Sequence, residues 1–115
     1  MVEAAQRRKP VLIDGYVSGA SALAATAIAP GVTGYVIASH RSQELGHAAV
    51  LQHLGLRPLL DLDLRLGEGT GAVLALPVVR AAVHLLNEMA TFGDAGVSGR
   101  DDPGAPEPRH NGAHN

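Results

Sequence analysis

Residues 11–42, VLIDGYVSGASALAATAIAPGVTGYVIASHRS, decide the fold of this chain. Two short apolar runs, Val11–Asp14 and Gly34–Ser39, are typical of strands buried on both faces. The segment between them, residues 18–29, is rich in alanine, opens at Ser18 as a candidate cap and closes before Pro30, which predicts a closely packed helix. A helix between two buried strands predicts a β-α-β unit with parallel strands.

The segments that follow continue the alternation of strands and helices. Residues 42–55 predict a second helix, with Ser42 at its N-cap and Gly55 as its terminator. Residues 56–69 alternate leucine with mostly polar residues, which predicts an extended segment with one buried face. Residues 70–92 are helical in composition, and we expect Pro77 to kink that helix or to begin a second one. The fold class predicted is therefore α/β, a Rossmann-like three-layer arrangement around a parallel sheet.

The length of 115 residues fits one domain with one core. We expect order over residues 10–92 and a flexible N-terminus over residues 1–9. Residues 93–115 contain five glycines, three prolines and only four apolar side chains, too few to offset the entropy lost on ordering. This segment is predicted to be a disordered tail.

Composition excludes several classes of function. The net charge is -2 and no basic cluster exceeds residues 7–9, so we expect no nucleic-acid partner. Cysteine is absent, and His47, His53 and His84 fall on predicted helices without acidic partners, so no metal site is expected. The longest nearly uncharged stretch, residues 16–40, is interrupted by serine, proline and glycine, which argues against a membrane span and favours a cytoplasmic protein.

A glycine-rich turn over residues 65–72, RLGEGTGA, places one carboxylate, Glu68, between glycines. Glycine is costly to order, so this density indicates unusual backbone angles or a ligand close to the backbone. The spacing matches neither the phosphate-binding P-loop nor the dinucleotide-binding fingerprint. From its chemistry, Glu68 is a candidate general base, an acceptor for a ribose hydroxyl, or a first-turn residue that complements the helix dipole.

Functional side chains are expected where the parallel strands end, since ligands of such sheets bind outside the carboxyl ends of the strands. Nearby helix N-termini would favour an anion such as phosphate. Taken alone, the serines before helices are more often caps, and His40 is expected to be solvated. The residues that converge in this prediction are Asp14 and Gly15, then Ser39, His40, Arg41 and Ser42, and finally Gly67, Glu68 and Gly69.

Three blocks of sequence, in this order, resemble the C-terminal part of the nicotinate-nucleotide:dimethylbenzimidazole phosphoribosyltransferase family. They are PVLIDGYVSGASALAA, ASHRSQELGHAAVLQHLGLRPLLDLDLRLGEGTGAVLALPVVRAA and LLNEMATFGDAGVS, and they span about residues 9–98. The resemblance implies transfer of phosphoribosyl from nicotinate mononucleotide to 5,6-dimethylbenzimidazole, which yields α-ribazole 5'-phosphate and nicotinate in cobalamin biosynthesis.

The resemblance also implies roles for individual residues. Glu68, in RLGEG, is the expected catalytic base, and Leu66 and Gly67 are expected to line the pocket for the benzimidazole. Gly15 and Ser42 are expected to contact the ribose phosphate. The other two residues expected in loops that face the nucleotide are Asp14 and Ser39.

No cofactor is implied, because the positively charged nicotinate of the donor is already a good leaving group. Family members are homodimers and carry a large N-terminal portion that this sequence lacks. The chain is therefore expected to form a homodimer or to associate with an N-terminal half, and to need that half for activity. The alternatives are a module that binds nucleotide or benzimidazole without turnover, and a structural role through apolar faces that the absent half would cover.

Overall fold

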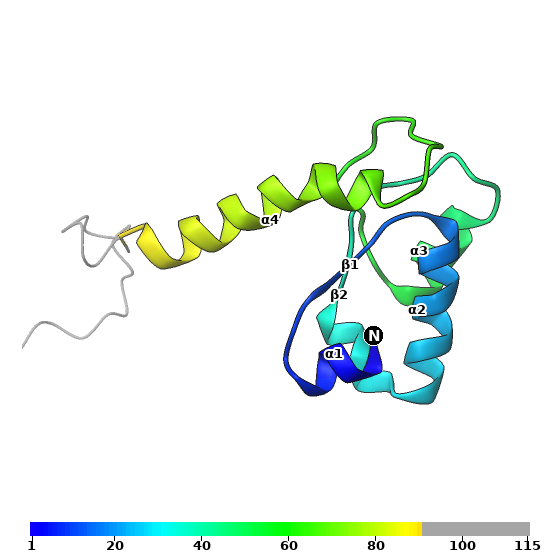
Figure 1. Ribbon diagram of the computed structural model, residues 1–115, viewed down its shortest axis with the longest axis horizontal. Coiled ribbons are helices and arrows are strands. Elements are labelled where there is room, and N and C mark those ends of the chain that lie inside the picture. Colours follow the sequence, from blue (N-terminus) through cyan, green and yellow to red (C-terminus); the bar gives the residue numbers. More distant parts are fainter. Residues whose placement is uncertain (91–115) are drawn as a thin grey trace, which may run out of the picture. The chain divides into compact units, whose positions relative to one another are not determined.

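The computed structural model describes residues 1–90, so the tail predicted over residues 93–115 lies outside the described part of the chain. Residues 1–83 form one compact unit, and a second begins at His84. The elements, in chain order, are α1 (Val2–Gln6), β1 (Val11–Ile13), α2 (Tyr16–Ile28), the 3-10 helix η1 (Pro30–Tyr35), β2 (Val36–Ala38), α3 (His47–Leu54) and α4 (Thr70–Glu88) (Figure 1).

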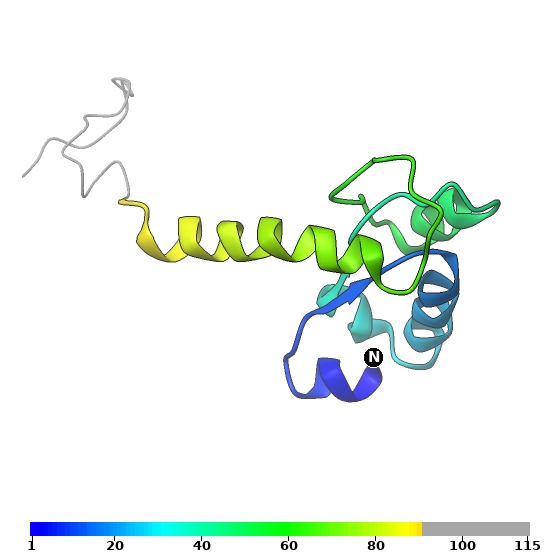
Figure 2. The same cartoon turned by 45° about the horizontal axis from the view of Figure 1, so that its top comes forward.

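The predicted β-α-β unit is present. Strands β1 and β2 pair in parallel, with Val11 opposite Val36 and Ile13 opposite Ala38, and they lie side by side in both views (Figures 1 and 2). One more backbone hydrogen bond, from the Ser39 N–H to the carbonyl oxygen of Ile13 at 3.0 Å, extends the pairing. The ends of both strands are thereby held next to each other, at the edge where the sequence places its candidate functional residues.

The core lies where α2 packs against β1 and α3. Small residues allow this packing, because a Cβ added at Gly19 would lie only 2.9 Å from Cγ1 of Val50. The alanine-rich helix predicted from the sequence therefore brings two backbones close together. The buried hydrophobic residues of this core cluster are Ile13, Ala22, Ala25, Val32, Val36, Ala38, Val50, Leu51 and Leu54.

The N-terminus differs from the prediction of a flexible segment. Residues Val2–Gln6 form α1, and Met1, Val2 and Ala5 pack against the core cluster. The side chains of Glu3 and Arg7 form an ion pair of 2.7 Å one helical turn apart. The flexible prediction is wrong here because the apolar residues at positions 1, 2 and 5 share one helical face that the core can bury.

Both predicted serine caps are wrong. Helix α2 begins at Tyr16 with Gly15 at its N-cap, and the Ser18 hydroxyl donates to the Gly15 carbonyl oxygen at 2.9 Å. Helix α3 begins at His47 with a left-handed Gly46 at its N-cap, four residues after the predicted cap at Ser42. Serine at a helix start is only a statistical preference, and in both cases a glycine takes the position.

Residues 56–69 do not form the predicted strand with a buried face. An isolated bridge pairs Leu60 with His40, and a few backbone hydrogen bonds run beside it, including Leu59 N–H to the Ala38 carbonyl oxygen at 3.0 Å. The alternating leucines are not buried as a set, since Leu62 is 54% exposed and Leu66 71% exposed. The segment is a loop that runs along the end of β2 and then leads into the glycine turn.

Helix α4 runs from Thr70 to Glu88 as one helix with Pro77 inside it, so the second helix that Pro77 was expected to begin is absent from this range. Only Gly71 and Ala75 of this helix are buried. By length and composition it is the one helix of residues 1–90 able to cross a membrane, a criterion that helices of soluble proteins also meet. Its exposed apolar residues within the first unit include Val73, Leu74, Leu76, Val78 and Val83.

Candidate active site

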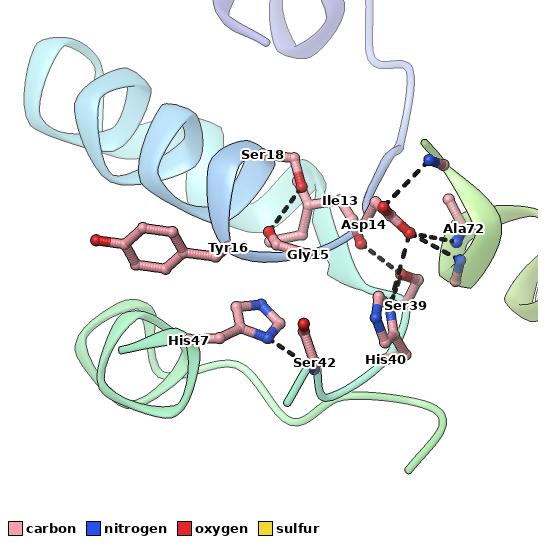
Figure 3. Close-up of polar contacts among 12 residues, drawn as sticks. Ile13, Asp14, Gly15, Tyr16, Ser18, Ser39, His40, Ser42, His47 and Ala72 are labelled. Carbon is pink, nitrogen blue, oxygen red and sulfur yellow. Dashed lines mark hydrogen bonds and ion pairs between the residues drawn. The ribbon is translucent and has the colours of Figure 1, made fainter. Parts of the chain in front are cut away.

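Asp14 connects the end of β1 to the glycine turn. One carboxylate oxygen, Oδ1, accepts hydrogen bonds from the N–H groups of Gly71 at 2.7 Å and Ala72 at 3.2 Å, and the other, Oδ2, accepts from the N–H of Gly69 at 3.1 Å (Figure 3). The first N–H groups of a helix have no partners within the helix. Asp14 therefore satisfies the start of α4 from a strand more than 50 residues earlier in the chain.

The turn that Asp14 holds has three consecutive residues in the left-handed region. The φ angles are 76° at Gly67, 55° at Glu68 and 79° at Gly69. Glycine adopts such angles freely, whereas a residue with a side chain does so at a cost of about 1–2 kcal/mol. The two glycines explain the composition of the turn, and Glu68 is the strained residue between them. Its side chain is exposed.

His40 is buried behind this turn, contrary to the expectation of a solvated side chain. It is 2% exposed, and its Nδ1 lies 3.7 Å from Oδ1 of Asp14 and 3.3 Å from Oγ of Ser39. The Ser39 hydroxyl donates its proton to the Ile13 carbonyl oxygen at 2.6 Å. Since Oγ can then only accept from His40, we assign the proton of the neutral imidazole to Nδ1.

Gly71 provides the space for the His40 ring. A Cβ at residue 71 would lie 1.8 Å from Nδ1 and 2.4 Å from Cε1 of His40. No side chain larger than a hydrogen atom fits there without displacing the ring. The third glycine of the turn is therefore explained by a close contact with His40, because Gly71 has no positive φ angle.

A second buried histidine, His47, holds the loop that follows β2. Its Nδ1 accepts a hydrogen bond from the N–H of Ser42 at 2.9 Å, so the ring proton is on Nε2, which is buried without a partner among residues 1–90. The pKa of His47 is lowered below its ordinary value, chiefly because burial disfavours the charged ring and secondly because of His40. His47 therefore acts as a neutral hydrogen-bond acceptor that fixes the backbone at Ser42.

A cavity of about 430 Å³ opens at the N-terminus of α2. Its lining, among the described residues, includes the side chains of Asp14, Glu44 and Glu68 but no lysine or arginine. Oε2 of Glu44 accepts a hydrogen bond of 3.2 Å from the N–H of Tyr16, so this carboxylate occupies the start of α2, where the helix dipole favours negative charge. The cavity is thus lined by three acidic residues together with Tyr16 and Val17 of α2.

The structure brings part of the predicted site together. Asp14, Gly15, Gly67 and Glu68 line the cavity, whereas Leu66 is exposed but outside its lining. Ser39 is fully buried, with its hydroxyl committed to the end of β1. Ser42 is also buried, but its Oγ lies 3.8 Å from the position of a Cβ on Gly15, which makes these two residues neighbours.

The supporting roles of four residues are not predicted by the sequence, namely those of His40, which is expected only at the end of the second strand, and of His47, Glu44 and Gly71. For three of them the only local signal is the run SHRSQELGH after β2, in which two histidines and a glutamate lie close together. For Gly71 the signal is a third glycine that the left-handed turn does not require. Within residues 1–90, no group of three His, Cys, Asp or Glu side chains is arranged to hold a metal ion.

Comparisons with known proteins point to one family. A family model described as phosphoribosyltransferase matches residues 1–97. The nicotinate-nucleotide–dimethylbenzimidazole phosphoribosyltransferase of Chloroflexus aurantiacus is 63% identical over 95 residues, which are 83% of this chain and 27% of that protein. The enzyme of the same name from Chlorobaculum tepidum is 55% identical over 93 residues, 81% of this chain and 26% of the relative.

A solved structure extends the comparison to the fold. The crystal structure of the enzyme of that name from Thermus thermophilus superimposes with a TM-score of 0.80 at 52% identity, covering 86% of this chain and 30% of that one. This confirms the α/β fold class and the family resemblance predicted from the sequence. The chain spans between a quarter and a third of the length of these relatives. Because the family model covers most of its residues, the chain belongs to the nicotinate-nucleotide–dimethylbenzimidazole phosphoribosyltransferase family.

Proposed function

We propose that this chain supplies the general base of a phosphoribosyl transfer from nicotinate mononucleotide to 5,6-dimethylbenzimidazole, in cobalamin biosynthesis. The observation that carries the proposal is the placement of Glu68, which is exposed beside an acidic cavity and held by a turn anchored through Asp14. A carboxylate at such a position is free to accept a proton from a bound substrate.

The reaction balances with one base and no cofactor. A nitrogen of the benzimidazole forms a bond to C1' of the ribosyl group, and the bond from C1' to the nicotinate nitrogen breaks. The electron pair of that bond neutralises the pyridinium, so nicotinate leaves without needing a proton. The second nitrogen of the benzimidazole loses its N–H proton, and Glu68 accepts it.

The charge of the cavity supports this substrate class. Asp14, Glu44 and Glu68 contribute an acidic lining, which favours the positive pyridinium of the donor and the positive charge that develops on the ribosyl group in the transition state. Leu66, exposed beside Gly67, provides apolar surface for the flat benzimidazole. Gly15 and Ser42, which are neighbours, are the proposed contacts of the ribose phosphate. Because the Glu44 carboxylate lies at the same helix start, the phosphate binds there only when Glu44 moves away.

The proposal includes a partner. Helix α4 exposes apolar residues such as Val73 and Leu74. In the relatives, the part of the chain outside the matched region is more than twice as long as the matched region. We infer that a portion equivalent to that additional chain is required for activity, and that the assembled protein is a cytoplasmic homodimer. The alternative is a module that binds nucleotide or benzimidazole without turnover in any assembly.

The test is reconstitution with a matched control. The purified chain is mixed with, or fused to, the portion of the Chloroflexus aurantiacus relative that lies outside the matched region. The mixture is incubated with both substrates, and α-ribazole phosphate is detected by mass spectrometry. We expect product from the wild-type chain and from Glu3→Gln, a surface control far from the cavity in sequence, and about 100-fold less or lower still from Glu68→Gln. Full activity of Glu68→Gln would contradict the proposal, and substrate binding without turnover in an assembled complex would support the alternative.

A further inference from the structure

Both oxygens of the Asp14 carboxylate are already bound by backbone N–H groups. Both oxygens accept hydrogen bonds from the glycine turn and the first turn of α4, at 3.1 Å from Gly69, 2.7 Å from Gly71 and 3.2 Å from Ala72. These three N–H groups belong to residues that lie within four positions after Glu68, the proposed base. Because Asp14 directly follows β1, these hydrogen bonds anchor the turn to the parallel sheet.

His40 supports the same turn from behind. Its buried ring fills the space that Gly71 leaves, and its Nδ1 proton is directed at Ser39 Oγ and Asp14 Oδ1, at 3.3 and 3.7 Å. Ser39 is in turn bound to the carbonyl oxygen of Ile13 at 2.6 Å. A continuous chain of polar contacts therefore leads from the ends of both strands to the start of α4 (Figure 3).

Glu68 is the residue in this assembly that needs external support. It adopts a φ angle of 55° between two glycines with similar angles. A residue with a side chain keeps such a conformation only where its surroundings determine it. These surroundings are the hydrogen bonds that Asp14 accepts on the C-terminal side of the turn. Two backbone hydrogen bonds add to them, from Thr70 N–H to the Gly67 carbonyl oxygen at 3.0 Å and from Gln43 N–H to the Leu64 carbonyl oxygen at 2.9 Å.

We propose that Asp14 and His40 are positioning residues, which hold Glu68 in its left-handed conformation and fix the direction of its carboxylate, and that neither contacts substrate. The role of the held carboxylate rests on the proposed function, whereas the positioning itself does not. The family resemblance implies that Asp14 contacts the nucleotide, whereas in the structure its carboxylate binds the backbone of the turn.

The test uses nuclear magnetic resonance on the purified 115-residue chain without substrate, so its result is independent of turnover. The measurements are amide hydrogen exchange at Gly69, Gly71 and Ala72 and the 13Cα chemical shift of Glu68, which reports its backbone angles. The variants are Asp14→Ala and Asp14→Asn. Asp61→Asn is the control, because Asp61 is half exposed and pairs with Arg41 at 3.0 Å.

In Asp14→Ala we expect exchange at the three amides to accelerate by about 10-fold or more, as for loss of a hydrogen bond to a charged acceptor. The Glu68 shift should move away from the left-handed value. Asp14→Asn keeps one acceptor oxygen, so protection at Gly71 and Ala72 should be partly rescued and that at Gly69 lost. The control variant should match the wild type.

Two results would overturn the proposal. One is wild-type exchange and an unchanged Glu68 shift in Asp14→Ala. The other is equal acceleration in the paired residues of β2, such as Ile37, which would show that Asp14 stabilises the whole fold rather than the turn. If Asp14→Ala does not fold, Asp14→Asn decides alone, because its predicted pattern distinguishes Gly69 from its two neighbours.

Discussion

Replacing Gly71 by alanine tests the close contact that holds the first turn of α4. The added Cβ would lie 1.8 Å from Nδ1 of His40, whereas ordinary contacts are 3.4 Å or longer. The ring is 2% exposed and bound to Ser39 and Asp14, so it cannot move without losing these contacts. Overpacking of this kind costs about 1–3 kcal/mol or more, while alanine gains at most about 1 kcal/mol over glycine in a helix.

We therefore expect Gly71→Ala to lower the free energy of unfolding by about 1–3 kcal/mol, measured by urea denaturation followed by circular dichroism. Gly31→Ala is the matched control, since nothing lies within 4 Å of its added Cβ, and it should stay within about 1 kcal/mol of the wild type. In the background of His40→Ala, the ring is gone and the cost of Gly71→Ala should largely disappear. Wild-type stability of Gly71→Ala, or an unchanged cost without the ring, would refute the reasoning.

Three further predictions concern the core, the buried histidine and the start of α2. Leu51→Ala truncates a side chain that is 4% exposed and should lower the free energy of unfolding by about 2–5 kcal/mol in urea denaturation. Leu45→Ala, at a position that is 97% exposed, should leave it almost unchanged, and equal effects of the two variants would contradict the assigned core. Because the pKa of His47 is lowered in the folded chain, the unfolded chain binds the proton more readily, so stability is full above about pH 6.5 and falls as the pH drops below it; His47→Gln should flatten this dependence and His53→Gln should not, and an unchanged slope in His47→Gln would refute the assignment. Glu44→Gln removes the negative charge at the first amide of α2 and should cost about 0.3–1 kcal/mol at low salt and less at high salt, while a cost that does not depend on salt would exclude the helix-dipole explanation.

The β-α-β unit could be predicted from the sequence because its signals are local. The apolar runs around Ile13 and Ile37 identify buried strands without knowledge of their partners, and the alanine-rich segment between them identifies the helix. The position of Glu68 in a tight turn could likewise be predicted, because the flanking glycines encode the left-handed backbone directly.

The remainder depended on contacts between distant residues. The alternating leucines of residues 56–69 predict a buried face only if a neighbouring strand covers it, and the structure provides one isolated bridge within the described residues, between Leu60 and His40. His40 is buried because Gly71, 31 positions later, leaves room for its ring. Neither relation can be recognised from the spacing of residues in the sequence alone.

The predictions about the site divide in the same way, between local signals and contacts of distant residues. The general-base hypothesis for Glu68 came from a local motif and from the family resemblance. The expected nucleotide contacts of Asp14 and Ser39 rest on the family resemblance and on their location at strand ends. Location at a strand end predicts proximity to the cavity but not the direction of each side chain. In the structure Asp14 points to the amides of the turn and Ser39 to the Ile13 carbonyl oxygen.

The measurement that tests the central claim most directly is the rate of α-ribazole phosphate formation by the reconstituted enzyme with wild-type Glu68 and with Glu68→Gln. Glutamine preserves the size of the side chain but cannot accept the proton at a useful rate. We expect a loss of kcat of about 100-fold or more in Glu68→Gln, the range for removal of a general base. Equal rates for the two proteins, with complex formation verified for both, would contradict it.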